Sequence, residues 1–80
     1  MYYVYILICK NEKLYIGCTN DLQERIKRHQ YGFVPATKEL RPVNLIGYFA
    51  FIDKYTAYNF EKYLKSGSGR AFLKKRLIKL

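Results

Sequence analysis

Two runs of strand-forming residues, separated by only four polar residues, most constrain how this chain can fold. Residues 2–9 and 14–18 are rich in aromatic and β-branched side chains, and the polar residues 10–13 lie between them. Two strands that are joined by so short a connection form an antiparallel hairpin. The chain is therefore expected to begin with a hairpin, against which the remaining elements must pack.

Side chains alternate between the two faces of a strand, so the apolar residues predict the register of this hairpin. The purely apolar set consists of Val4, Ile6, Ile8, Leu14 and Ile16. Burying that set on one face puts Tyr5 and Tyr15 together on the other, with Gly17 leaving a gap beside them. Tyrosine is also an ordinary strand residue on a half-exposed sheet, so neither tyrosine alone indicates a site.

The same alternation separates the two cysteines of the chain. Cys9 and Cys18 fall on opposite faces, so no disulfide between them is expected. They form no CxxC motif, and the single histidine is too few for a zinc site with them. We interpret both as small buried apolar residues.

Capping residues predict where two helices begin. Asp21, with Glu24 three residues later, resembles a capping box that starts a helix, which then ends near Gly32. Asp53 is a plausible N-cap for a later helix that reaches about Leu64. Glycine and serine at residues 66–69 predict a break before a last helix.

These signals give the following elements in chain order: strands over residues 2–9 and 14–18, a helix over 22–30, a long loop over 32–44, a strand over 45–52, a helix over 54–64 and a helix over 70–80. The order is β-β-α-β-α-α. It predicts an α+β class, with helices packed on a small antiparallel sheet. A length of 80 residues is enough for one such domain, which we expect to span residues 1–80.

The charge of the chain favours an anionic partner. The formal net charge is +9, and residues 54–80 hold eight Lys or Arg against one acid, a net charge of +7. Nucleic acid is the first expectation and an acidic membrane surface the second. The apolar start over residues 1–8 is too short for a signal peptide, and no apolar run approaches the roughly 20 residues of a membrane span. We therefore expect a cytoplasmic protein that does not cross a membrane.

Two of the predicted helices direct polar side chains toward the core. Arg25 and His29 share a helical stripe with apolar residues, and so does Glu61, the one acid of the basic segment. An arginine there often extends to solvent, and a lone histidine is more often a hydrogen-bonded core residue than a catalyst. A buried Glu61 must pair with a cation, for instance Arg25, or bind a metal.

These residues also form a recognisable motif. Tyr3-Val4-Tyr5 stands where the GIY triplet of GIY-YIG nucleases stands, and Tyr15-Ile16-Gly17 is the YIG triplet. Arg25 lies ten residues after Tyr15, and His29 lies four after Arg25. The chain resembles the GIY-YIG nuclease superfamily over nearly its whole length, and residues 14–22 and 61–70 resemble its small stand-alone bacterial members most.

The resemblance implies a three-stranded antiparallel sheet flanked by helices, one divalent metal ion (Mg²⁺ or Mn²⁺) and cleavage of DNA. It implies that Glu61 is the metal ligand and that Arg25 binds the scissile phosphate. It also implies that Tyr15, alone or with Tyr5, orients and deprotonates the attacking water, with His29 close by. One carboxylate suffices for Mg²⁺, which fills its shell with water and substrate oxygens.

The identity of the general base stays open at this stage. Tyrosine is a poor base at its reference pKa of about 10, so that role requires neighbouring cations. Histidine, with a reference pKa of about 6.5, suits proton transfer near neutrality. His29 is therefore an alternative base to Tyr15.

Several basic or polar residues are candidates for DNA phosphate contacts. Lys38, Lys65 and Arg70 are favoured because they flank the site in the motif, although any one of them is about as well explained as part of a solvated face. The wider set also contains Thr37, Arg41, Lys74, Lys75 and Arg76. Phosphate contacts do not depend on base sequence. We expect a monomer of low sequence specificity, with any selectivity supplied by DNA shape or by a protein partner.

Two other functions compete with a DNA endonuclease. The chain departs from the family pattern at Cys18, where some members have lysine, and it has no asparagine after Asn59, where many members have one. The missing asparagine favours a catalytically silent nucleic-acid-binding module of the same fold. The third function is membrane-surface binding through the amphipathic C-terminal helix, which we rank last.

Overall fold

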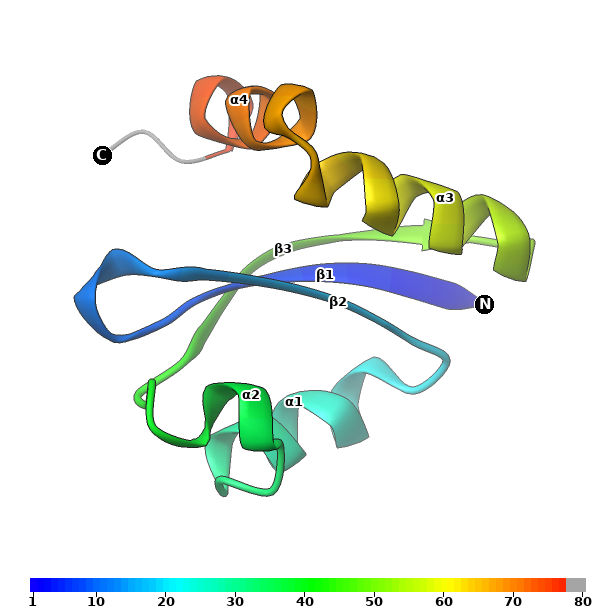
Figure 1. Ribbon diagram of the computed structural model, residues 1–80. Coiled ribbons are helices and arrows are strands. Elements are labelled where there is room, and N and C mark those ends of the chain that lie inside the picture. Colours follow the sequence, from blue (N-terminus) through cyan, green and yellow to red (C-terminus); the bar gives the residue numbers. More distant parts are fainter. Residues whose placement is uncertain (78–80) are drawn as a thin grey trace.

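A three-stranded antiparallel sheet lies between two helical layers in the computed structural model, which describes residues 1–77 (Figure 1). The strands are β1 (Tyr2–Ile8), β2 (Leu14–Thr19) and β3 (Asn44–Phe51), in the order β2-β1-β3. The helices are α1 (Leu22–Gln30), α2 (Pro35–Lys38), α3 (Lys54–Lys65) and α4 (Gly67–Arg76). The predicted α+β class and the three-stranded antiparallel sheet are confirmed.

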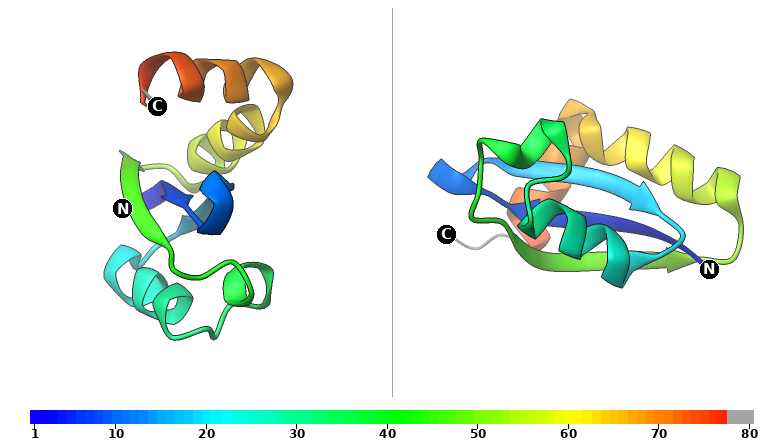
Figure 2. Two further views of the ribbon diagram at one scale, coloured as in Figure 1. Left: turned by 90° about the vertical axis from the view of Figure 1, so that its left-hand side faces the viewer. Right: turned by 90° about the horizontal axis from the view of Figure 1, so that it is seen from below.

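Helices cover both faces of the sheet. In Figure 1, α3 and α4 lie above it and α1 and α2 below, and the view from below in Figure 2 shows the latter two crossing its underside. The strands therefore bury side chains on both faces. This arrangement places α1 and α3 on opposite sides of the edge strand β2.

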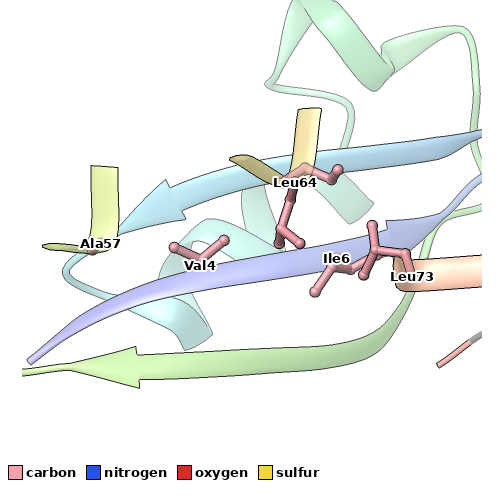
Figure 3. Packing of buried hydrophobic residues seen from close by; sticks show 6 residues of the cluster. Val4, Ile6, Ala57, Leu64 and Leu73 are labelled. Atoms are coloured by element: carbon pink, nitrogen blue, oxygen red, sulfur yellow. The ribbon is translucent and has the colours of Figure 1, made fainter. Parts of the chain in front are cut away.

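The register of the hairpin follows the predicted alternation. Ile6 pairs with Ile16, and Tyr5 pairs with Gly17. Val4 and Ile6 are fully buried against Ala57, Leu64 and Leu73 of the upper helices (Figure 3).

A second cluster lies on the lower face of the sheet. There Tyr5 and Leu7 are fully buried with Cys9 and Val43. Cys18 instead packs against the upper cluster, and both thiols are free. The prediction of cysteines on opposite faces without a disulfide is therefore confirmed.

The capping residues start the helices where the sequence indicates. The Asp21 carboxylate accepts a hydrogen bond from the Glu24 backbone N–H at 3.2 Å. The Asp53 carboxylate accepts from the Thr56 N–H at 2.8 Å, and these bonds hold the pKa of Asp53 below its ordinary value. Such bonds satisfy donors that the first helical turn leaves unpaired.

Two predictions about irregular segments are wrong in extent. Residues 32–44 are not wholly a loop, since Pro35 begins the short helix α2, as proline does readily in a first turn. Residues 66–69 do break the helix as predicted, but Ser66 alone lies between α3 and α4, and Gly67, Ser68 and Gly69 belong to α4. Ser66 caps α4, and its hydroxyl accepts from the Gly69 N–H at 3.2 Å. Gly69 is tolerated in the helix because α4 packs directly on the end of α3, where the space admits no side chain.

The last predicted helix also has different bounds. It begins at Gly67 rather than residue 70 and ends at Arg76, with Leu77 as its C-cap. The rest of the predicted helix, up to Leu80, lies outside the described residues.

Candidate active site

A hydrogen-bonded chain of three buried side chains lies under the sheet. The Tyr5 hydroxyl bonds to Nε2 of His29 at 2.8 Å, and Nδ1 of His29 bonds to the Thr37 hydroxyl at 2.7 Å. All three residues have no exposed surface. They come from β1, α1 and α2, so the chain joins the sheet to both lower helices.

Burial favours the neutral form of Tyr5 and of His29, the two ionisable groups in this hydrogen-bonded chain. It raises the pKa of Tyr5, an effect to which Tyr15 adds and which Arg25 partly offsets. Burial, followed by the nearby positive charge of Arg25, lowers the pKa of His29 below 6.5. A neutral imidazole has one donor and one acceptor nitrogen, and Tyr5 and Thr37 occupy both. His29 therefore has no nitrogen free to face solvent.

Tyr15 lies beside this chain and is only half buried, on the edge strand β2. Its ring centroid is 5.0 Å from that of His29 and 6.2 Å from that of Tyr5. The predicted grouping of the two tyrosines on one face is thus confirmed. Of the aromatic groups in the cluster, Tyr15 is the one that solvent reaches.

Gly17 makes the packing of this cluster possible. A Cβ atom at this position would collide with the hydroxyl and the Cζ atom of Tyr5. The space beside the tyrosines is therefore not an empty gap, since the end of the Tyr5 ring fills it. The glycine of the YIG triplet is required here for close approach rather than for an unusual backbone conformation.

Arg25 and Glu61 come from helices on opposite sides of the sheet, and both affect the pKa of Cys18 on β2. The pKa of the Cys18 thiol is raised by burial and by the Glu61 carboxylate, and it is lowered by the Arg25 guanidinium. Arg25 also lowers the pKa of Tyr5 and of His29. Arg25 thus affects the pKa of groups on both faces of the sheet, Tyr5 and His29 below it and Cys18 above it.

Comparison with known proteins shows the family of this protein. Residues 1–76 match the family model described as the GIY-YIG catalytic domain. The chain belongs to the GIY-YIG family. That membership places it in the GIY-YIG nuclease superfamily.

Two bacterial relatives support the assignment. The UPF0213 protein CPE1444 of Clostridium perfringens is 46% identical over 66 residues, which cover 81% of this chain and 71% of that protein. A UPF0213 protein of Lactiplantibacillus plantarum is 37% identical over 76 residues, which cover 91% and 75% of the two chains. The solution NMR structure of the UPF0213 protein BH0048 from Bacillus halodurans is 35% identical, with a TM-score of 0.59 over 94% of this chain and 84% of that one.

The partner of Glu61 in this GIY-YIG chain is Lys65 rather than Arg25. One carboxylate oxygen of Glu61 lies 3.1 Å from the Lys65 ammonium, one helical turn away on α3. The Glu61 side chain keeps 20% of its surface exposed, so solvent and ligands reach it. Within residues 1–77, no three His, Cys, Asp or Glu side chains gather into a metal-binding group. Glu61 fits an ion that takes a single carboxylate and otherwise water, as Mg²⁺ does.

The residues that the sequence predicts to contact DNA differ in their exposure to solvent. Lys38, Lys65 and Arg70 are exposed, the first on α2 below the sheet and the others on α3 and α4 above it. Thr37 cannot contact DNA phosphates, because it is wholly buried under His29. No sequence feature indicated that Thr37 would bond to His29, because residues 32–44 resembled a loop. Over residues 1–77, none of the helices is both long and apolar enough for a membrane span.

Two further residues near the site were not anticipated. A pocket of about 270 Å³ at the end of β2 is lined by Arg25 and also by Lys54 and Tyr58 of α3. The sequence did hold a signal for them, because Lys54, Tyr58, Glu61 and Lys65 recur at the spacing of one helix face.

Proposed function

We propose that this chain is a DNA endonuclease that uses one Mg²⁺ or Mn²⁺ ion and has low sequence specificity. One observation carries the proposal: Arg25 and Cys18 line one pocket at the end of the edge strand β2, the Glu61 carboxylate raises the pKa of the Cys18 thiol, and Tyr15 lies half-exposed on the same strand. A guanidinium, a carboxylate and a phenol at one accessible edge suit hydrolysis of a phosphodiester. Selectivity would come from DNA shape or from a protein partner.

Arg25 is proposed to bind the scissile phosphate. Its planar guanidinium matches two phosphate oxygens. The negative charge that develops on the phosphate in the transition state strengthens this contact. Exposed Lys38, Lys65 and Arg70 are proposed to contact other phosphates of the strand.

Tyr15 is proposed to take the proton of the attacking water. It is accessible, whereas Tyr5 is buried with a raised pKa and His29 has both nitrogens occupied. Tyr5 and His29 then serve to hold the Tyr15 ring in place through their contacts with it. This assigns the base role to Tyr15 and a positioning role to His29.

Glu61 is proposed to hold the metal ion. When bound, the ion would supply positive charge to the phosphate and to the leaving oxygen. Lys65 keeps the Glu61 carboxylate oriented along α3.

Cleavage of a panel of flapped, nicked, branched and single-stranded DNA in Mg²⁺ or Mn²⁺ tests the proposal. We expect Glu61→Gln and Tyr15→Phe each to lower the rate by about 10² to 10⁴, the usual worth of a base or a charge stabiliser. Lys13→Ala, at the opposite end of β2, is the matched surface control. Activity that survives both site substitutions would show that the residues are wrongly assigned.

The second candidate is a catalytically silent DNA-binding module of the same fold. The Lys65 ammonium on the Glu61 carboxylate favours it, because a cation already neutralises that group. Such a module predicts that the wild type binds the whole DNA panel and cuts none of it. Its affinity would also be unchanged by Mg²⁺ and by Glu61→Gln.

A further inference from the structure

The pocket at the end of β2 has the lining of an anion site. Two of its seven lining residues are cations, Arg25 from α1 and Lys54 from α3, and none is acidic. The remainder are a thiol, hydroxyls and one amide, contributed by Tyr2, Cys18, Thr19, Asn20 and Tyr58. A phosphate is the anion that such a set of charges and hydrogen-bond donors suits.

Lys54 occupies a position that its helix does not favour. It is the first residue of α3, and no acidic residue lies in that first turn. A helix N-terminus carries partial positive charge, so a lysine there is mildly destabilising. Residues that break such a local rule tend to lie at functional sites.

The ring of Tyr58 holds the Lys54 ammonium at the pocket. The Lys54 nitrogen lies 5.5 Å from the centroid of this ring, one turn further along α3. That distance is within the range of a cation–π contact. The contact orders a long side chain that is otherwise free in solvent.

The same helix face continues to the proposed metal ligand. Lys54, Tyr58, Glu61 and Lys65 form one row along α3, and Lys54 precedes Glu61 by seven residues, or about 10 Å along the axis. Lys54 is therefore too far along the helix to share one phosphate with Glu61. A strand that passes Glu61 along this helix face would next meet Lys54.

We propose that Lys54 binds a second DNA phosphate, beside the one that is cleaved, and that Tyr58 positions its ammonium. The pocket then fixes the path of the strand across the edge of the sheet from α3 to Arg25. This inference rests on the proposed function, because it takes DNA as the ligand. It makes Lys54 a strand-binding residue and Tyr58 a positioning residue.

The test measures binding of a short fluorescein-labelled oligonucleotide in EDTA, where no cleavage occurs, over a range of salt concentrations. Each lost phosphate contact lowers the slope of log K against log[salt] by about 0.7 on single strands and about 0.9 on duplex. We expect that loss in Lys54→Ala and in Tyr58→Ala. Tyr58→Phe, which keeps the ring, should retain the wild-type slope.

Lys13→Ala removes the same charge at the far end of β2 and serves as the matched control. Its slope should stay that of the wild type. Equal slopes in Lys54→Ala and Lys13→Ala would overturn the phosphate contact. A wild-type slope in Tyr58→Ala would overturn the positioning role. Thermal unfolding should show Lys54→Ala to be at least as stable as the wild type, since Lys54 is exposed and stands at the start of α3, where a cation is unfavourable.

A parallel cleavage assay separates this inference from the function on which it rests. Cleavage by the wild type, with an unchanged slope in Lys54→Ala, would overturn the phosphate contact alone. A lowered slope in Lys54→Ala, with no cleavage by the wild type, would overturn the nuclease and leave the contact standing. No binding of DNA by the wild type would overturn both.

Discussion

The individual residues of the site owe their chemistry to where they are buried. Tyr5 and Tyr15 are the same residue type on the same sheet face, but only Tyr5 is wholly enclosed and bonded to His29. Burial raises the pKa of Tyr5 and favours its neutral form. The accessible Tyr15 is therefore the better candidate for proton transfer.

Gly17→Ala tests the packing of this cluster. The added methyl group would collide with the Tyr5 hydroxyl and displace it from Nε2 of His29. We expect a loss of about 1–3 kcal/mol in the free energy of unfolding, the usual cost of overpacking a core, together with lost DNA cleavage. Urea denaturation and the cleavage assay measure the two effects. Gly47→Ala on β3 is the control, since its methyl group would meet nothing within 4 Å, and equal effects of the two substitutions would contradict this account.

At the scale of elements, two contacts place the helices that carry the site. Ser66 caps α4, and Gly69 lets α4 pack against the backbone of Tyr63 and Leu64 at the end of α3. Thr37 of α2 bonds to His29 of α1 and so fixes both lower helices under the sheet. Neither contact follows from helix propensity.

Gly69→Ala and Gly67→Ala separate propensity from packing. Both put alanine into α4, and alanine is the better helix former by about 1 kcal/mol. At Gly69 the methyl group would strike the Tyr63 carbonyl oxygen and the Leu64 Cα, whereas at Gly67 it meets nothing within 4 Å. We expect Gly69→Ala to lower the free energy of unfolding by about 1–3 kcal/mol and Gly67→Ala to raise it slightly. Denaturation midpoints measure both, and a stabilised Gly69→Ala variant would show that α4 does not pack as described.

At the scale of the whole molecule, the buried histidine makes stability depend on pH. Burial and Arg25 lower the pKa of His29 in the folded chain below its ordinary 6.5. As pH falls through that value, the unfolded chain takes up a proton that the folded chain does not, so the folded state loses stability. His29 is the only histidine in the sequence, so no other histidine contributes to this loss of stability.

We expect the wild-type free energy of unfolding to decrease as pH falls from about 8 to about 5, and His29→Gln to show a smaller decrease. Urea denaturation at several pH values measures the free energy of unfolding of both proteins. The variant should be less stable at every pH, because it loses the packing and hydrogen bonds of a buried ring. The informative quantity is therefore the slope of the free energy of unfolding against pH. Equal slopes in the wild type and in His29→Gln would contradict a neutral buried His29.

Sequence patterns were sufficient for the frame of the molecule. Strand alternation predicted which residues of β1 and β2 share a face, and Asp21 and Asp53 predicted two helix starts, because these signals depend on neighbours in the chain. The motif spacing predicted family membership. Patterns predicted too long an irregular segment at residues 32–44 and 66–69, because proline and glycine indicate irregular structure unless a neighbouring element stabilises a helix there.

What the sequence by itself determined is the hairpin, its register and the set of residues offered to the site. Only the tertiary structure decided how those residues are used. It buried Tyr5, His29 and Thr37 as one hydrogen-bonded chain, left Tyr15 half-exposed, and placed Arg25 and Glu61 on helices that cover opposite faces of the sheet. The physical reason is that periodicity fixes the face on which a side chain lies. Its burial, charge state and partners depend on which helix covers that face, and those helices lie far away in the sequence.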